Sequence, residues 1–363
     1  MKLALTAGGT GGHILPAIAV LDALRSRDGL LTEVRFFGPD DRGERATVES
    51  RGVVFVSVPA AAVRGRGPLS LVRSFARLAW GVAVAFRRLR AFRPDAVFST
   101  GGYASFPASL AARVLRRPLV VYLPDVTPGW AVRAEKRLAT RIATTTGAAL
   151  AHLPEKKTRV TGYPVRARFF ELDRAQARAA IGLDATAHML LVAGATQGAK
   201  AINEAIFAAA PGLCSEAVVY HVTGPADIAR ARAVRAALPE NLRGRYFVDA
   251  FREDLPDLML AADLGVFRAG ASVLGEVPAA SLPAVLVPGR YAGGHQRDNA
   301  RWLEEGGVAE VVPEDALPGL PSRLLALLGD DARLAAMRES ARALARPGAA
   351  DAIADLIVEV AKR

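Results

Sequence analysis

Acidic residues are absent from one long stretch of this sequence. Between Ser50 and Pro94 there is no aspartate or glutamate, whereas nine arginines occur there. The chain as a whole has a formal net charge of +11, and a cationic stretch of this kind suits an anionic partner such as a membrane surface or a nucleic acid. Because aromatic residues make up only 6% of the chain and no nucleic-acid-binding motif accompanies the charge, we expect no nucleic-acid partner.

Further absences narrow the class of protein. The single cysteine, Cys214, cannot form an internal disulfide and fits a reducing compartment. No cluster of cysteine and histidine predicts a metal site, no Asp-x-Asp motif occurs that would hold a metal-bound diphosphate, and we expect no cofactor. Neither a signal peptide nor an apolar run of the roughly 18 residues that span a bilayer is evident.

Glycines follow an apolar run at four places in the chain, and each time a helical pattern comes next. The first reads AGGTGGH after KLALT, and the others contain Gly101 and Gly102, Gly194 and Gly198, and Gly270. Glycine lets a ligand approach the backbone, and a strand followed by a helix places N–H groups at the positive end of the helix. The first loop matches neither the dinucleotide fingerprint nor the phosphate loop of nucleotide hydrolases. Two such units in each half predict an α/β fold of two Rossmann-like, doubly wound domains whose glycine loops face a central cleft.

The domain boundary is predicted near VTGYPVRARF. Residues 158–160 form a predicted last strand, after which Gly162 and Pro164 interrupt regular structure. We assign residues 1–162 to the first domain and 163–340 to the second. Residues 341–363 contain a C-terminal helix that can pack back on the first domain.

The acid-free stretch also has helical spacing. Its apolar residues share one predicted face: Leu71, Phe75, Leu78, Val82, Phe86 and Leu89. Trp80 lies among arginines on the other side, a pattern typical of a helix that rests on an anionic membrane; an ordinary basic surface helix is the alternative. The candidate membrane-contacting residues are Arg73, Arg77, Trp80, Arg87 and Arg88.

Five motifs resemble, in order and at matching spacing, those of the MurG family. They are TAGGTGGHILPA, STGGYASFPASLAA, GATQGAKAIN, FRAGASVLGE and GGHQRDNA. The family comprises membrane-associated N-acetylglucosaminyltransferases of peptidoglycan synthesis with the two-domain GT-B fold. The resemblance implies inverting transfer of GlcNAc from UDP-GlcNAc to the C4 hydroxyl of MurNAc in lipid I, which is undecaprenyl-pyrophosphoryl-MurNAc-pentapeptide. It implies a peripheral enzyme at the cytoplasmic face of the cell membrane, with an acceptor- and membrane-facing first domain and a donor-binding second domain.

The resemblance also implies which residues bind the substrates. Glu276 matches the glutamate that accepts both hydroxyls of the ribose; a capping box with Ser272 is excluded because Gly275 stands at the position that such a box requires. The other donor-side matches are Thr10, Gly11, Gly12, Asp125, Arg166, Thr196, Arg252, Arg268, Ala271, Ser272, Val273, Leu274, Gly275, Gln296 and Asn299. The acceptor-side matches are Gly101, Gly102 and Tyr103.

His13 is the candidate general base, because histidine can accept the proton of the attacking hydroxyl near neutral pH. The alternative role is a structural hydrogen bond that holds the first glycine loop. The family's EQN stretch reads LPD here, so Asp125 replaces an asparagine and either binds the donor sugar or acts as an acid or base. Tyr163 and Ala195 are further departures, from a common asparagine and a glycine.

Two other classes of function stay open. The first is another GT-B enzyme, either a glycolipid synthase with a diacylglycerol acceptor or a UDP-GlcNAc epimerase. An epimerase needs no lipid acceptor and would leave the arginine-rich stretch without a role. The second is a non-enzymatic binder of anionic lipid or nucleic acid, for which the ordered donor motifs would be a coincidence.

Overall fold

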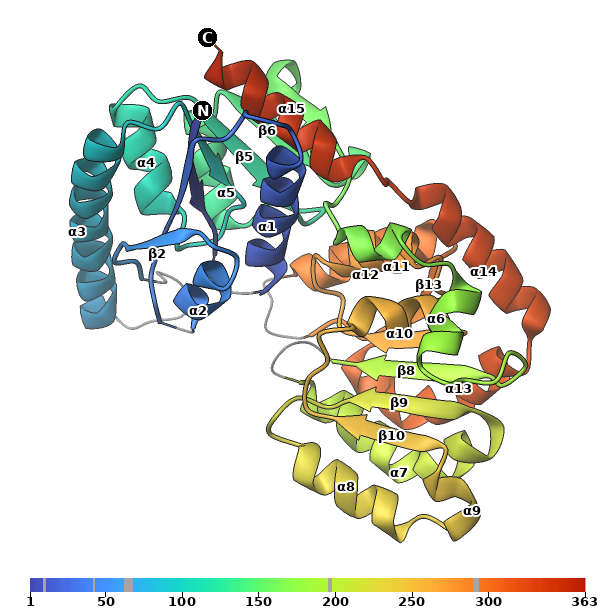
Figure 1. Cartoon of the computed structure of the whole chain (residues 1–363). Helices are drawn as coiled ribbons and strands as arrows, with labels where there is room; N and C mark the ends of the chain where they lie inside the picture. The colour runs from blue at the N-terminus through green and yellow to red at the C-terminus, as the bar shows by residue number, and fades with distance from the viewer. Residues whose placement is uncertain (9–10, 42, 62–67, 195–197, 290–293, 363) are drawn as a thin grey trace. The chain divides into compact units, whose positions relative to one another are not determined.

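The computed structural model describes residues 1–8, 11–41, 43–61, 68–194, 198–289 and 294–362. The chain divides into two compact units, Met1–Val165 with Gly348–Arg363, and Arg166–Pro347. Each unit contains one sheet of parallel strands that alternate with helices along the chain (Figure 1). The expected α/β class with two doubly wound domains is thereby confirmed.

The first unit is built on a sheet with the strand order β3-β2-β1-β4-β5-β6-β7. Its strands are β1 Lys2–Thr6, β2 Glu33–Gly38, β3 Val54–Ser57, β4 Ala96–Ser99, β5 Leu119–Leu123, β6 Arg141–Thr144 and β7 Thr158–Val160. Its helices are α1 Gly11–Arg25, α2 Glu44–Glu49, α3 Pro68–Phe92, α4 Phe106–Val114, α5 Trp130–Leu138 and α15 Ala349–Ala361, with 3₁₀ turns at Gly147–His152 and Glu155–Lys157. Residues of β4 and β5 are buried throughout, as expected for strands covered on both faces.

The second unit has the strand order β10-β9-β8-β11-β12-β13. Its strands are β8 Met189–Ala193, β9 Val218–Val222, β10 Tyr246–Asp249, β11 Leu264–Phe267, β12 Ala284–Leu286 and β13 Ala309–Val311. Its helices are α6 Arg174–Ala180, α7 Lys200–Glu216, α8 Ile228–Ala237, α9 Glu240–Arg243, α10 Leu255–Ala261, α11 Val273–Ala279, α12 His295–Glu305, α13 Leu320–Leu328 and α14 Asp331–Leu344, with 3₁₀ turns at Ala167–Phe170 and Glu314–Gly319.

The chain reverses its strand order between β1 and β4 in the first sheet and between β8 and β11 in the second. Ligands of open parallel sheets bind beyond the carboxyl ends of the strands at such a switch point. All four glycine loops follow one of these four strands. The topology therefore brings the predicted loops together in pairs, one pair in each unit.

Helix α1 buries the face that its spacing predicts. Ile14, Ala17, Ile18, Leu21 and Leu24 are all at most 5% exposed, which confirms the predicted periodicity. The last helix, α15, packs beside α1 in the first unit (Figure 1). Ion pairs from Arg27 to Asp355 and from Arg141 to Glu359 add polar contacts to this packing.

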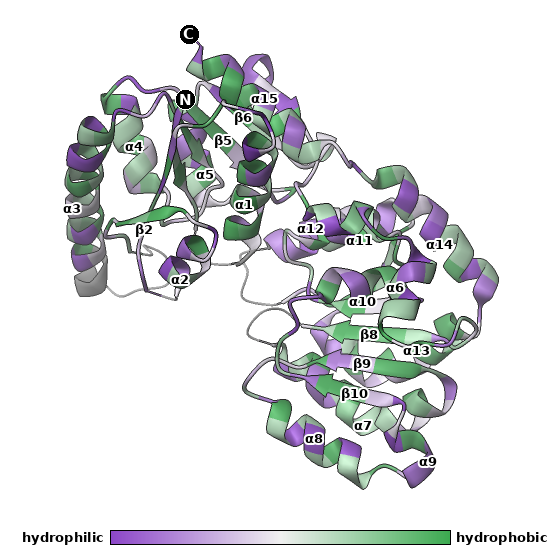
Figure 2. Ribbon diagram, viewed as in Figure 1, coloured by the Kyte–Doolittle hydropathy of each residue, from purple (hydrophilic) through white to green (hydrophobic). Residues whose placement is uncertain are grey.

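The predicted buried face of α3 is wrong in part. The helix buries Ser74, Leu78, Ala85, Leu89 and Phe92, with Gly81 so close to the backbone that a Cβ there would lie 1.9 Å from the Pro59 carbonyl oxygen. The packing of α3 on α4 and the close approach of Gly81 to Pro59 set which face of the helix is turned inward. Phe75 consequently stays 60% exposed, and Figure 2 shows apolar and hydrophilic residues alternating along α3.

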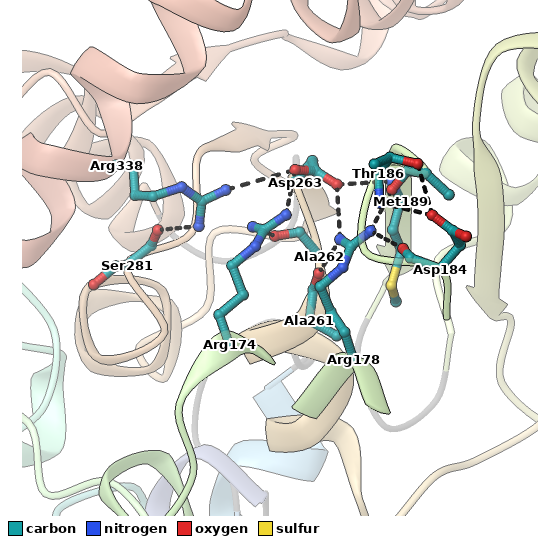
Figure 3. A network of polar contacts seen from close by, with 11 residues as sticks. Arg174, Arg178, Asp184, Thr186, Met189, Ala261, Ala262, Asp263, Ser281 and Arg338 are labelled. Carbon is teal, nitrogen blue, oxygen red and sulfur yellow. Dashed lines mark hydrogen bonds and ion pairs between the residues drawn. The ribbon is translucent and has the colours of Figure 1, made fainter. Parts of the chain in front are cut away.

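Three arginines share one carboxylate at the amino end of β11 (Figure 3). Asp263 accepts from Arg174 at 2.5 Å and from Arg178 at 3.3 Å, and Arg338 lies 3.9 Å away. The guanidinium groups also donate to main-chain carbonyls, including those of Ala261, Ala262 and Ser281. This network joins α6, β11 and α14 at the amino-terminal ends of the strands. The glycine loops lie at the opposite, carboxyl ends.

Candidate active site

The two glycine loops of the first unit touch each other at the switch point. A Cβ on Gly102 would lie 2.6 Å from the Gly8 Cα atom, and one on Gly8 would lie 2.9 Å from the His13 ring. Gly101 and Gly102 also have φ angles of 78° and 89°, which residues other than glycine rarely adopt. The bare backbone in these motifs therefore allows two loops and an imidazole ring to pack within one small volume.

His13 is held by a reciprocal pair of hydrogen bonds to Thr100. The ring Nδ1 lies 2.8 Å from the Thr100 carbonyl oxygen, and the Thr100 hydroxyl donates to the His13 carbonyl at 2.8 Å. Because a carbonyl can only accept, Nδ1 carries a proton, and Nε2 is the acceptor nitrogen of the neutral ring. The structural hydrogen bond and the base role, which the sequence leaves as alternatives, are thus compatible with each other.

A buried carboxyl group lies behind the second glycine loop. Glu135 on α5 is fully buried and accepts hydrogen bonds from Ser99 at 3.1 Å, Ser105 at 2.7 Å and Ser109 at 2.8 Å. Burial raises the pKa of Glu135 to about 7, although the three hydroxyl donors lower it. Sequence reasoning missed this cluster. Its signal is a glutamate four residues after Ala131, on the buried face of α5.

The other predicted residues of the first unit lie near the same edge. Asp125 follows β5 and is half-buried, and Tyr103 packs against the cluster of Ala60, Leu78 and Ala104. Tyr163, a departure from the family pattern, donates to the Gly12 carbonyl at 3.3 Å. Gly11 and Gly12 open helix α1, whereas Thr10 lies outside the described residues.

Glu276, on the helix α11 that follows β11, lies beside Arg166 in the second unit. The Glu276 carboxylate is 3.7 Å from the Arg166 guanidinium and also accepts from the Ser272 hydroxyl. Burial raises the pKa of Glu276, and the charge of Arg166 opposes that shift. Arg166 donates to the Glu253 carbonyl at 3.0 Å, while its buried Nε has no partner among the described residues. A carboxylate and an N–H donor therefore converge next to the fourth glycine loop.

The remaining donor-side candidates are anchored within the second unit. Gln296 accepts from the Gly289 N–H at 2.7 Å, and Asn299 donates to the Ala269 carbonyl at 3.1 Å. Arg268 pairs with Glu314 at 2.6 Å, a partner that the sequence pattern did not indicate.

Arg252 is held in its own loop by Asp249 and Asp254, at 3.2 and 2.6 Å. Ala271 precedes α11, Ser272 is its N-cap, and Val273, Leu274 and Gly275 form its first turn. Thr196 and Ala195 lie outside the described residues.

A groove of about 710 Å³ runs between α3 and α4 in the first unit. Its floor is apolar and includes Ala79, Val82, Phe86, Ala111 and Val114, and its rim includes Arg87, Arg90 and Arg93. Val72, Phe75 and Trp80 are exposed on the same helix, at 71%, 60% and 58%. Of the candidate membrane residues, Arg73, Arg87 and Arg88 are exposed, and Arg77 pairs with Asp41 at 3.1 Å. Among the described helices, none is long and apolar enough to cross a bilayer.

Comparisons with known proteins place the whole chain among glycosyltransferases. Residues 3–144 match the glycosyltransferase family 28 N-terminal domain, and residues 189–356 match the C-terminal domain of that family. A protein from Roseiflexus sp. (strain RS-1) is 38% identical, with 97% of this chain and 93% of the relative covered. A protein from Nitratidesulfovibrio vulgaris strain Hildenborough is also 38% identical, with 99% and 98% covered. Both are named UDP-N-acetylglucosamine–N-acetylmuramyl-(pentapeptide) pyrophosphoryl-undecaprenol N-acetylglucosamine transferase.

Solved structures agree with the fold. MurG of Acinetobacter baumannii superposes with a TM-score of 0.75 at 24% identity, with 99% of each chain covered. A UDP-GlcNAc 2-epimerase from Neisseria meningitidis has a TM-score of 0.68 at 14% identity, with 99% of this chain and 100% of that chain covered. The fold alone thus does not separate a transferase from an epimerase, whereas the relatives that match along the whole sequence do. Taken with the paired glycine loops and the residues gathered at both switch points, they show that the chain belongs to the MurG family of N-acetylglucosaminyltransferases.

Proposed function

We propose that this chain transfers GlcNAc from UDP-GlcNAc to the C4 hydroxyl of MurNAc in lipid I, with inversion at the anomeric carbon, and so produces lipid II for peptidoglycan. The single observation that carries the proposal is the identity of 38% to transferases of that name over 97% or more of the chain. The geometry of both units supports it. The test is incubation with UDP-GlcNAc and a short-chain lipid I analogue, where the expected product is heavier by one GlcNAc residue.

His13 is the base in this proposal. Nδ1–H donates to the Thr100 carbonyl, which leaves the acceptor lone pair of the neutral ring on Nε2, and Nε2 can take the proton of the attacking hydroxyl. Gly101, Gly102 and Tyr103, on the adjoining loop, contact the acceptor. Asp125 contacts the donor sugar from the end of β5 or acts as an acid or base; substitution by asparagine separates the two roles.

The second unit binds the donor. Glu276 accepts the ribose hydroxyls. The buried Nε of Arg166, which has no partner among the described residues, donates to a diphosphate oxygen. Gln296 contacts the GlcNAc hydroxyls from the start of α12, and Asn299, on the same helix, completes that motif. The other donor-binding residues of this unit are Thr196, Arg252, Arg268 and the 271–275 loop. Thr10, Gly11 and Gly12 are the donor-binding residues of the first unit. Fixed N–H groups and Arg166 stabilise the charge on the leaving UDP.

The first unit docks on the cytoplasmic face of an anionic membrane as a peripheral protein. A polyprenyl acceptor has its pyrophosphate at the membrane surface, so a catalyst that does not span the bilayer must approach that surface. Helix α3 presents exposed apolar side chains beside Arg73, Arg77, Arg87 and Arg88, a combination that binds anionic interfaces. Trp80 is exposed enough to enter the headgroup layer.

A further inference from the structure

Glu135 requires an explanation because a buried carboxyl group is costly unless hydrogen bonds compensate it. The side chain is fully buried in the first unit, and its partners are three serine hydroxyls. Ser99 is the last residue of β4, Ser105 precedes α4, and Ser109 lies inside α4. The two carboxylate oxygens therefore join a strand end and a helix across the second glycine loop.

Two of these serines, Ser99 and Ser105, also form hydrogen bonds with the backbone of the loop. The Gly101 N–H donates to the Ser99 hydroxyl at 3.1 Å, and that hydroxyl donates to Glu135. At the other end, the Ser105 hydroxyl donates to Glu135 at 2.7 Å, and the Ser105 N–H donates to the Gly102 carbonyl at 3.2 Å. Glu135 thus anchors Ser99 and Ser105, the two residues that bind the glycines of the turn, and both glycines have positive φ.

The same turn holds His13. Thr100 lies between Ser99 and Gly101, and its carbonyl and hydroxyl groups make both hydrogen bonds to His13. Gly102 packs on Gly8, against which the imidazole ring also packs. A rotation of the 99–102 turn would move the Thr100 carbonyl, and with it the His13 ring that is bonded to it.

We propose that Glu135 is a positioning residue for the transfer reaction: through Ser99 and Ser105 it holds the 99–102 turn in the conformation that orients His13. The inference rests on the proposed function, with His13 as the base. A carboxylate is suited to this role because it accepts from several hydroxyls at once and binds them more strongly than a neutral acceptor does. The reaction rate depends strongly on the position of a catalytic group, since a misplacement of about 1 Å can lower the rate about 100-fold.

A matched pair of serine substitutions tests the proposal without removing the carboxyl group. Ser99 and Ser109 are both fully buried, and each donates one hydrogen bond to Glu135. Only Ser99 also accepts from the turn, at the Gly101 N–H. Ser99→Ala is expected to lower kcat about tenfold or more and to leave the KM for UDP-GlcNAc within about twofold. Ser109→Ala is expected to leave both near the wild-type values.

The second readout is the ¹⁵N NMR spectrum of the His13 ring in the unliganded protein. Ser99→Ala should shift the Nδ1 resonance, because the Thr100 carbonyl moves, whereas Ser109→Ala should not. Glu135→Gln should behave like Ser99→Ala, since an amide cannot accept from all three hydroxyls. Equal effects of the two serine substitutions on kcat and on the His13 resonance would overturn the proposal. A shifted resonance with unchanged kcat in an active enzyme would also overturn it.

Failure of the proposed function has a different signature. A wild-type protein that forms no product from UDP-GlcNAc and the lipid I analogue would contradict the transferase assignment. The His13 resonance would still decide whether the Glu135 cluster orients the ring, because that measurement needs no substrate.

Discussion

Substitution of Glu276 tests the proposed binding of the UDP-GlcNAc ribose most directly. We expect Glu276→Ala to weaken UDP-GlcNAc binding while the fold persists, because the carboxylate is half-buried beside Arg166 and its loss opens no apolar core. Losing the two hydrogen bonds from the ribose to a charged group should lower the affinity roughly 10-fold or more. Isothermal calorimetry measures the Kd for UDP-GlcNAc. The control is Glu253→Ala, an exposed carboxylate on the residue whose carbonyl accepts from Arg166; unchanged affinity in Glu276→Ala would remove the ribose role.

His13 connects the first glycine loop to the chemistry. We expect His13→Ala to lower kcat by about 100-fold or more and to change donor affinity little, because a general base acts on the proton in the transition state. Steady-state kinetics with calorimetry separates the two quantities. His152→Ala, an exposed histidine of the same unit, provides the control. Near-normal turnover of His13→Ala across neutral pH would leave the histidine with only its structural bond to Thr100.

Asp125 decides between two roles with one substitution. If it binds sugar hydroxyls as the family's asparagine does, Asp125→Asn should keep or improve turnover, because an amide oxygen accepts and an amide nitrogen donates. If it is an acid or base, the same variant should lose about 100-fold or more in kcat while the donor still binds. Our expectation is the binding role, and a large loss of kcat at normal affinity would contradict it.

At the scale of secondary structure elements, the Asp263 network ties α6 and α14 to the amino end of β11 (Figure 3). Removing a partner from a buried charge pair leaves an uncompensated charge, so Asp263→Asn should destabilise the second unit by about 3 kcal/mol. Arg178, which is only 5% exposed, would lose its counter-charge. Trp302 fluorescence reports on this unit when Trp80 and Trp130 are replaced by phenylalanine, because no other tryptophan remains in the chain.

The control for this prediction is a solvent-exposed ion pair of the same unit. Glu339 pairs with Arg342 at 3.0 Å and its side chain is 72% exposed, so Glu339→Gln should cost less than about 1 kcal/mol. If both substitutions give the same small change in urea unfolding, the Asp263 network does not stabilise the second unit.

At the scale of the whole molecule, the net charge of +11 and the exposed face of α3 predict where the protein works. We expect it to co-sediment with anionic but not with neutral liposomes, and to be released by salt, because each basic residue near the surface contributes about 1 kcal/mol and screening removes it. Replacing Arg73, Arg77, Arg87 and Arg88 with glutamine should reduce binding. It should also reduce activity on a full-length lipid acceptor more than on a short soluble analogue.

The matched control removes the same number of charges from the second unit. Arg232, Arg235, Arg333 and Arg342 are exposed there, and their replacement with glutamine should leave liposome binding largely intact. Equal loss in the two quadruple variants would mean that overall charge, and not the α3 surface, attracts the protein to the membrane. Equal binding to neutral and anionic liposomes would contradict the electrostatic part of the proposal.

The amino-acid sequence by itself determined the two doubly wound domains, the four glycine loops and the buried face of α1. These features depend on local patterns, namely apolar runs, glycine positions and the 3.6-residue period, and such patterns are readable without knowing what packs against them. It also determined the family, through five motifs in fixed order. The C-terminal helix was predicted as well, and its contact with α1 was left open because nothing in its own sequence specifies that partner.

Only the tertiary structure decided which residues those patterns bring together. The inward face of α3 depends on the close contact between Gly81 and the Pro59 carbonyl, which lies outside the helix. For that reason the periodicity of α3 alone wrongly predicted that Phe75 is buried. The bond between His13 and Thr100 joins residues 87 positions apart, and Glu135 meets its serines from 26 to 36 positions away. In a parallel sheet, residues that are neighbours in space are separated along the chain by a whole strand–helix crossover. Local sequence patterns therefore cannot specify these polar contacts.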